Sequence, residues 1–110
     1  MPFLAAPPAV DLTTAVQTLY TCPNGFRVIA EANVSNKDAS NPVTVTLAWT
    51  DVNGTPANVS KNLVFTDIAA KDAIAPKRKV LEPGDTITGQ ASANGYAVAS
   101  IDITHSEPVT

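Results

Sequence analysis

Apolar and polar residues alternate with a period of two over much of the chain. The clearest instance is residues 43–50, in which Val43, Val45, Leu47 and Trp49 are separated by threonines and an alanine. Successive side chains of a β-strand point to opposite faces of its sheet, so this pattern predicts a strand with one face in the core. The other face of this strand would carry a row of threonines.

Similar patterns predict strands at residues 13–21, 26–36 and 59–68, with a shorter one at 77–81. The first two are expected to pair with each other across a Cys-Pro-Asn-Gly turn. Their predicted core contacts are Ala15, Leu19, Val28, Ala30, Ala32 and Val34. In the segment 59–68, Leu63 and Phe65 are expected to share one face. Residues 69–76 are compatible with a helical turn or with a crossover between sheets.

A turn at Asn94-Gly95 lies between two further segments, residues 86–93 and 96–103. Asn-Gly is the strongest short-range sign of a β-hairpin, because a type I′ turn needs positive φ at both central residues. We therefore expect these two segments to pair as a hairpin, introduced by the turn at Pro83-Gly84.

Asn-Gly turns recur at residues 24–25, 53–54 and 94–95, between about seven short strands, and no long helical period is present. This spacing predicts an all-β fold, an antiparallel β-sandwich that is either Ig-like or jelly-roll-like. A chain of 110 residues is long enough to bury one core. We expect a single β-sandwich domain at residues 13–110.

Residues 1–12 are expected to form an extended N-terminal arm, because Pro2, Pro7 and Pro8 remove backbone donors and force extended conformations. Such an arm is either disordered, laid along its own sheet, or docked on a neighbouring subunit. Docking is the preferred interpretation, because the apolar side chains at these positions would gain from burial. They are Phe3, Leu4 and Val10.

The charge of the chain argues against nucleic acid as a partner. The formal net charge is -3 and the sequence pI is about 4.8, so the basic face expected of a nucleic-acid binder is missing. The only basic run, Lys77, Arg78 and Lys79, either contacts an acidic partner or is solvated. No run approaches the roughly 20 apolar residues that span a bilayer, and no secretory signal is recognisable, so we expect no membrane partner.

The inventory of reactive residues argues against an enzyme and against a cofactor. His105 is the only histidine and Cys22 the only cysteine, so neither a two-histidine metal motif nor an intrachain disulfide is possible. A calcium site is conceivable on paper, but its four carboxylates lie in different turns and lack a loop signature. They are Asp51, Asp67, Asp72 and Asp85. We predict no metal site.

Aromatic residues offer one alternative function. Trp49, Tyr20 and Tyr96 would suit a carbohydrate-binding β-sandwich module if their rings formed one platform. Trp49 is, however, at one of the alternate positions of its strand that are predicted to face the core, so we expect its ring to be buried.

Three stretches occur in a characteristic order. Residues 19–25 are a strand ending in a Tyr-Thr-x-Pro-x-Gly turn, residues 28–36 alternate Val and Ala before closing in asparagines, and residues 81–87 contain a Leu-x-x-Gly-Asp turn. Together they resemble small β-sandwich virion proteins of tailed bacteriophages, over roughly residues 13–107. The match consists of turns and alternation, and the family supplies no ligand residues to carry over.

This resemblance implies a non-enzymatic structural protein of the virion, assembled in the host cytoplasm. It implies most directly a capsid decoration or cement protein that binds across neighbouring subunits of the major capsid protein; a tail, neck or fibre-associated virion protein is the alternative. Self-association as a dimer or trimer also follows from it. The predicted partner contacts are Phe3, Leu4, Val10, Lys77, Arg78 and Lys79.

Overall fold

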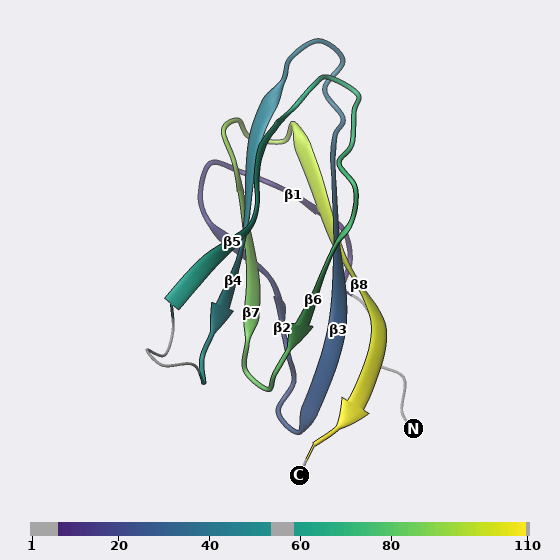
Figure 1. Cartoon of the computed structure of the whole chain (residues 1–110). Helices are drawn as coiled ribbons and strands as arrows, with labels where there is room; N and C mark the ends of the chain where they lie inside the picture. The colour runs from purple at the N-terminus through teal and green to yellow at the C-terminus, as the bar shows by residue number, and fades with distance from the viewer. Residues whose placement is uncertain (1–6, 54–58, 110) are drawn as a thin grey trace.

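Two antiparallel β-sheets of four strands pack face to face (Figure 1). The computed structural model describes residues 7–53 and 59–109. Within them the strands are β1 (Val10–Asp11), β2 (Gln17–Thr21), β3 (Phe26–Asn36), β4 (Val43–Asp51), β5 (Val59–Ile68), β6 (Lys77–Leu81), β7 (Thr86–Ala91) and β8 (Ala97–Pro108). The predicted all-β antiparallel sandwich is confirmed, with eight strands rather than about seven.

The strand order is that of a jelly roll. One sheet has the order β1-β8-β3-β6 and the other β2-β7-β4-β5. Strands therefore pair from the ends of the chain inwards: β1 with β8, β2 with β7, β3 with β6 and β4 with β5. A long antiparallel hairpin, rolled so that successive pairs fall in alternate sheets, gives this order. Of the two expected sandwich types, the structure has the jelly-roll-like one.

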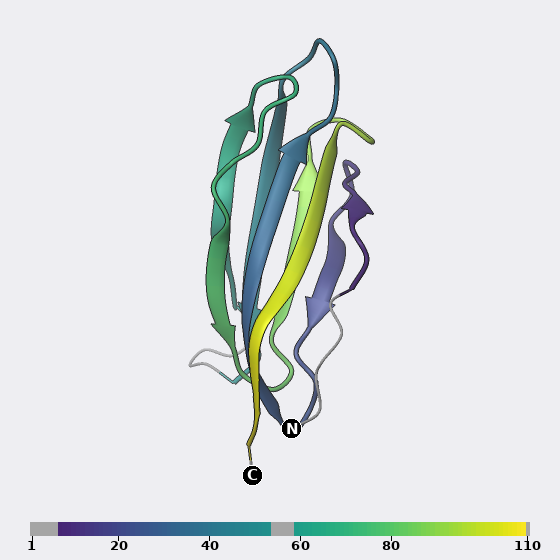
Figure 2. The same cartoon turned by 90° about the vertical axis from the view of Figure 1, so that its right-hand side faces the viewer.

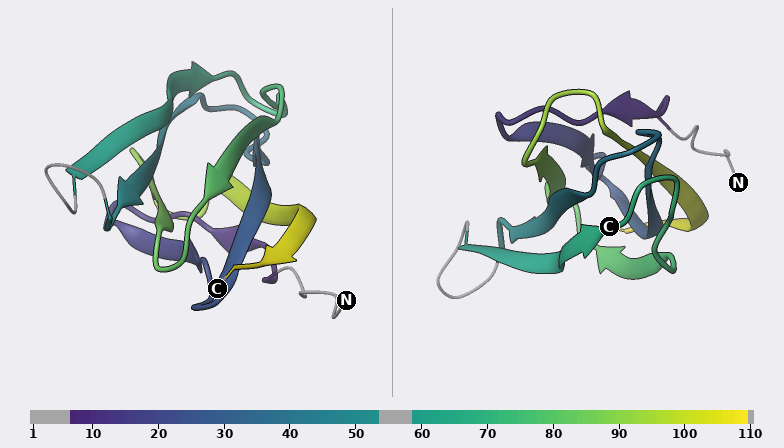
Figure 3. Two further views of the ribbon diagram at one scale, coloured as in Figure 1. Left: turned by 60° about the horizontal axis from the view of Figure 1, so that its bottom comes forward. Right: turned by 90° about the horizontal axis from the view of Figure 1, so that it is seen from above.

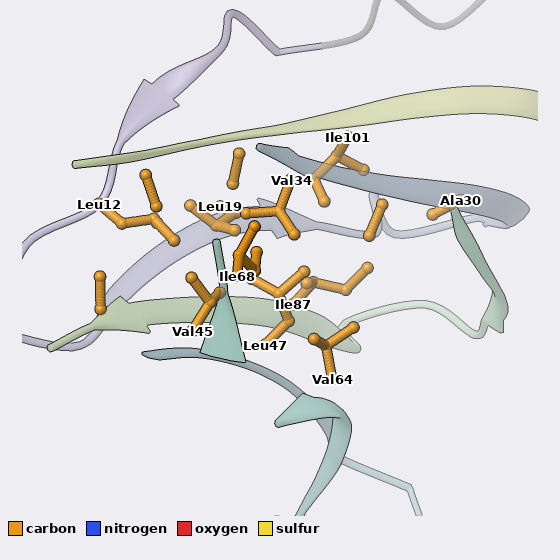
Figure 4. Close-up of a cluster of buried hydrophobic side chains, with 14 of the residues drawn as sticks. Leu12, Leu19, Ala30, Val34, Val45, Leu47, Val64, Ile68, Ile87 and Ile101 are labelled. Carbon is orange, nitrogen blue, oxygen red and sulfur yellow. The ribbon is translucent and has the colours of Figure 1, made fainter. Parts of the chain in front are cut away.

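The core lies between the two sheets and is built from every second residue of the long strands (Figure 4). In β3 the buried side chains run from Val28 to Val34, and in β4 they are Val43, Val45 and Leu47. These are the positions that the period of two predicts. The residue bounds predicted for β3 and β5 also agree with the structure.

The predicted hairpin at Asn94-Gly95 is wrong. β7 and β8 flank this turn but belong to different sheets. Gly95 has a φ of 77°, whereas Asn94 does not have the positive φ that a type I′ turn needs. The turn is instead held by the N-terminal segment. The Gly95 N–H donates to the Leu12 carbonyl at 2.9 Å, and the Thr14 N–H donates to Asn94 Oδ1 at 2.8 Å.

The predicted pairing of the first two long segments is wrong for a related reason. β2 pairs with β7, whereas β3 pairs with β6 and β8 in the other sheet. Among the described strands, β4 and β5 are the only two that are both consecutive in the chain and paired. The turn at residues 22–25 therefore joins the two layers.

The N-terminal segment crosses from one sheet to the other. Val10 pairs with Ala99 of β8, Gln17 pairs with Gly89 of β7, and Leu12 between them is completely buried. The expected arm of residues 1–12 is corrected accordingly: β1 and Leu12 belong to the sandwich, because they close the gap between β7 and β8. Of the alternatives for the arm, these residues lie along their own sheet.

The predicted core position Ala15 is exposed, whereas Leu19 is buried as predicted. The Thr13 N–H donates to Gln17 Oε1 at 3.1 Å, and the Ala15 N–H donates to Thr13 Oγ1 at 3.2 Å. These bonds form a turn, so the strand begins only at Gln17. The residue types in this segment do not by themselves predict that turn.

Residues 69–76 form a crossover between the sheets, as one of the two alternatives predicted. Two backbone hydrogen bonds anchor the crossover to β3: the Asn36 N–H donates to the Asp72 carbonyl at 2.8 Å, and the Ile74 N–H donates to the Val34 carbonyl at 3.3 Å. The chain thereby passes from the edge of one sheet to the edge of the other.

Candidate functional site

The side of the sandwich that carries β5 and β6 is open. Each is the last strand of its sheet, and both lie on the side opposite β1 and β2 (Figures 2 and 3). A groove of about 380 Å³ lies along this side. Its lining residues are Leu63, Val64, Phe65, Thr66, Ile74, Ala75 and Lys77. Most of them are apolar, and one is a cation.

β5 presents a long edge with apolar side chains. Leu47 pairs with Val64 and Ala48 pairs with Asn62, so Leu63 is an extra residue in a bulge. Leu63 packs against the core while Phe65 is 69% exposed, so the prediction that these two share a face is wrong. Sheet edges are commonly protected by short length, proline or charge. At its centre this ten-residue edge has no proline and no charged residue, although the bulge at Leu63 interrupts it.

β6 presents a short edge, protected by charge. Lys77 and Lys79 stand opposite Ala32 and Ala30 of β3, which face the core, so both lysines point toward the gap between the sheets. Inward-pointing charges on an edge strand discourage pairing with another strand. The two edges of this open side therefore differ in character.

The basic run predicted as a partner contact is divided between two faces. Arg78 stands opposite Glu31, and its Nε donates to Glu31 Oε2 at 2.9 Å. Lys77 lines the groove, and Lys79 lies over a tryptophan ring. Only the two lysines therefore share the open side with the apolar residues of β5.

Trp49 is half-buried rather than buried, because it lies near the end of β4, beside the open side. The Lys79 Nζ is 3.6 Å from the ring centroid and the Lys61 Nζ is 5.2 Å from it. Both distances suit cation–π attraction. The tryptophan thus holds two cations at the same edge.

Positive charge gathers at this side of an otherwise acidic protein. Three of the seven Lys and Arg residues, Lys61, Lys77 and Lys79, lie here, whereas Arg78 points to the other face of β6. Among the described residues, Lys61, Lys77 and Lys79 take part in no salt bridge. The open side therefore combines a groove lined mostly by apolar residues with three cations that form no salt bridge to a described residue.

The end of the sandwich near Trp49 contains a buried carboxylate that serves the fold. Asp85 is 1% exposed and accepts hydrogen bonds from the Val52 N–H at 3.1 Å and the Glu82 N–H at 3.0 Å. Trp49 Nε1 donates to it at 3.5 Å. These contacts tie the turn after β6 to the turn after β4. The carboxylate therefore supports the turns.

Cys22 is also buried at this end, with its Sγ 3.2 Å from the Phe26 carbonyl oxygen. Burial, and secondarily the nearby negative charge of Asp85, raise the pKa of this thiol. Because the thiolate is the nucleophilic form, a thiol with a raised pKa presents little nucleophile at neutral pH.

No grouping of three His, Cys, Asp or Glu side chains suited to a metal ion occurs in residues 7–53 or 59–109. The aromatic platform considered for a sugar is also not assembled. Trp49 and Tyr20 both stand opposite Ile87 near the start of β7, on its two sides, whereas Tyr96 follows the end of that strand. The same described ranges contain no helix long and apolar enough to cross a membrane.

The remaining predicted contacts lie elsewhere. Val10 is half-buried and packs against the core of its own domain. Phe3 and Leu4 lie outside the described residues. Sequence reasoning missed Phe65 and Ile74 as surface residues of the groove, because neither the bulge in β5 nor the identity of the edge strands can be read from the period of two.

Comparisons of the chain with protein-family models, with curated proteins and with solved structures find no match.

Proposed function

We propose that this chain is a non-enzymatic structural protein of a phage virion, a capsid decoration or cement protein that binds across neighbouring shell subunits. The observation that carries the proposal is the open side at β5 and β6, where a groove lined mostly by apolar residues lies beside lysines that form no salt bridge with any described residue. A surface of this kind suits attachment to another protein, because apolar contact supplies affinity and a polar rim supplies orientation.

The assignment to a virion is supported by the resemblance of residues 13–107 to small phage virion proteins. The fold is compatible with it, since jelly rolls are common among capsid proteins as well as lectins. Many weak contacts repeated over a symmetric shell would act together, so each single interface can be small.

The test is co-sedimentation of the purified protein with empty phage heads that lack it, with bound copies counted per major capsid subunit. A copy number close to that of the shell subunits is the expected result. A handful of copies per particle would instead favour a tail, neck or fibre-associated protein. No binding to heads or to complete particles would overturn the proposal.

The carbohydrate-binding alternative lacks a favourable observation. Lys79 already covers the Trp49 ring at 3.6 Å, so that ring face is not free to stack on a sugar. Trp49 fluorescence unresponsive to glycans is the corresponding expectation.

A further inference from the structure

We propose that the free edge of β5 binds an extended, acidic segment of a partner protein, which adds to the sheet as a further β-strand and is selected by Lys77, Lys79 and Lys61. This inference deepens the proposed function, on which it rests for the identity of the partner as a virion protein. The mode of binding rests on the geometry alone.

One of the two backbone edges of β5 is open to a further strand. β5 pairs with β4 on one side, and no described strand pairs with its other side. A strand added there would hydrogen-bond to β5 and extend the sheet β2-β7-β4-β5 by one member. Strand addition of this type takes affinity from backbone hydrogen bonds and specificity from pockets for alternate side chains.

The groove supplies those pockets. Val64 of β5 is paired with Leu47 of the neighbouring strand β4 and lines the groove. Ile74 and Ala75 of the crossover also line it. Every second side chain of an added strand would point into this gap. Small or branched apolar side chains at those positions fit a lining of this composition.

Charge indicates which segment fits. Lys77 lines the groove, and Lys79 and Lys61 continue the basic strip toward Trp49. An acidic side chain on the added strand would meet cations that lack a salt bridge among the described residues. A basic segment would meet repulsion instead, so the three lysines favour one class of partner and disfavour the other.

β6 is the less suitable edge, although it borders the same groove. It has five residues against ten in β5, and inward-pointing charges on an edge strand discourage pairing with another strand. The asymmetry assigns backbone pairing to β5 and charge recognition to β6.

The experiment uses the full chain and two arrays of labelled ten-residue peptides. In both arrays valine and threonine alternate with a charged residue, which is glutamate in one array and lysine in the other. Binding is measured by fluorescence anisotropy, and the contacted strand is located by amide hydrogen exchange. We expect glutamate peptides to bind at least about tenfold more tightly than lysine peptides, and to slow exchange in β5.

Two variants and two matched controls test the assigned residues. Lys77→Glu and Phe65→Ser are each expected to lower the affinity for the glutamate peptides by about tenfold. Lys71→Glu makes the same charge change on the crossover but outside the groove, and Val16→Ser removes an exposed apolar side chain from the opposite side. The affinity of both control variants for the glutamate peptides should stay within about twofold of the wild-type affinity. Circular dichroism of every variant checks that the fold is retained.

Several results would overturn the inference. They are an absence of peptide binding, equal affinity for the two arrays, and protection of amides outside β5. If the protein dimerises and Phe65→Ser abolishes the dimer, the β5 edge binds a second copy of this chain. If single-stranded DNA displaces the peptide, the lysines form a general site for polyanions.

The head-binding assay separates this inference from the proposed function. Heads that bind the wild type and both edge variants alike would leave the proposed function intact and refute the β5 mode. Peptide binding with the expected pattern, but no binding to heads, would refute the virion assignment and retain the edge site.

Discussion

Replacing Leu12 with alanine tests whether the N-terminal segment belongs to the core. Leu12 is 0% exposed and lies where the chain crosses from the sheet of β8 to the sheet of β7. Removing three buried carbon atoms costs about 2.4 kcal/mol, at about 0.8 kcal/mol for each. The cavity that remains raises the expected cost to about 3 to 5 kcal/mol. Since small domains have only about 5 to 15 kcal/mol of stability, this is a large fraction.

The assay is urea unfolding followed by the fluorescence of Trp49, the only tryptophan. With an m-value of about 1.5 kcal/mol/M, the unfolding midpoint of Leu12→Ala should fall by about 2 M or more. Val16→Ala is the control, because Val16 is 63% exposed four residues away. Its free energy of unfolding should change by less than about 0.5 kcal/mol. A loss below about 1 kcal/mol for Leu12→Ala would refute a core role for this segment.

A second substitution makes the test sharper. A Cβ added at Gly89 would lie 2.9 Å from the ends of both Leu12 and Leu19, so Gly89→Ala should overpack the core. The expected cost is about 1 to 3 kcal/mol. In the double variant with Leu12→Ala, the new methyl group would enter the vacated space, so the combined loss should be smaller than the sum. Additivity within about 0.5 kcal/mol would show that the two sites are not in contact.

Three further predictions concern other parts of the domain. The Cys22 thiol should react with a disulfide reagent only as fast as the protein unfolds, because it is buried with a raised pKa; rapid labelling of the native protein would contradict this. Backbone N–H groups that follow Asp38 in the chain donate hydrogen bonds to its carboxylate and lower the pKa of this group. The contribution of the Asp38 carboxylate to stability is therefore present above its unfolded-state pKa and is lost as the pH falls through its folded-state pKa. An NMR titration that gives an unshifted or raised pKa would count against those hydrogen bonds. Lys79→Met should lower stability by about 0.5 to 1 kcal/mol, and by more than Lys61→Met, since the Lys79 Nζ is nearer the Trp49 ring; urea unfolding of the two variants compares them directly.

Local alternation alone determined much of this fold. The bounds of β3 and β5 and the buried faces of β3 and β4 follow from residues next to one another in the chain, because side-chain direction in a strand is a local property. The sequence likewise shows by itself that the chain has one histidine and one cysteine, so it has no two-histidine metal motif and no intrachain disulfide. The all-β class followed from the same local features.

Partners of the strands depend on distant contacts, which the tertiary structure decided. The Asn94-Gly95 turn has the composition of a hairpin, yet its hydrogen bonds with the Leu12 carbonyl and the Thr14 N–H, some 80 residues earlier, hold it as a link between two sheets. Those bonds are available only because the jelly roll brings the N-terminal segment between β7 and β8.

The candidate site depends on this topology in the same way. Alternation along the predicted strand is enough to separate Lys77 and Lys79 from Arg78, but only the pairing with β3 decides that the two lysines face the gap between the sheets. Phe65 is exposed because it stands opposite Thr46, on the outer face of the sheet, and this register with β4 has no local sequence pattern. The sequence determined which side chains each strand offers; the order of strands in the sheets decided which of them lie at the open side.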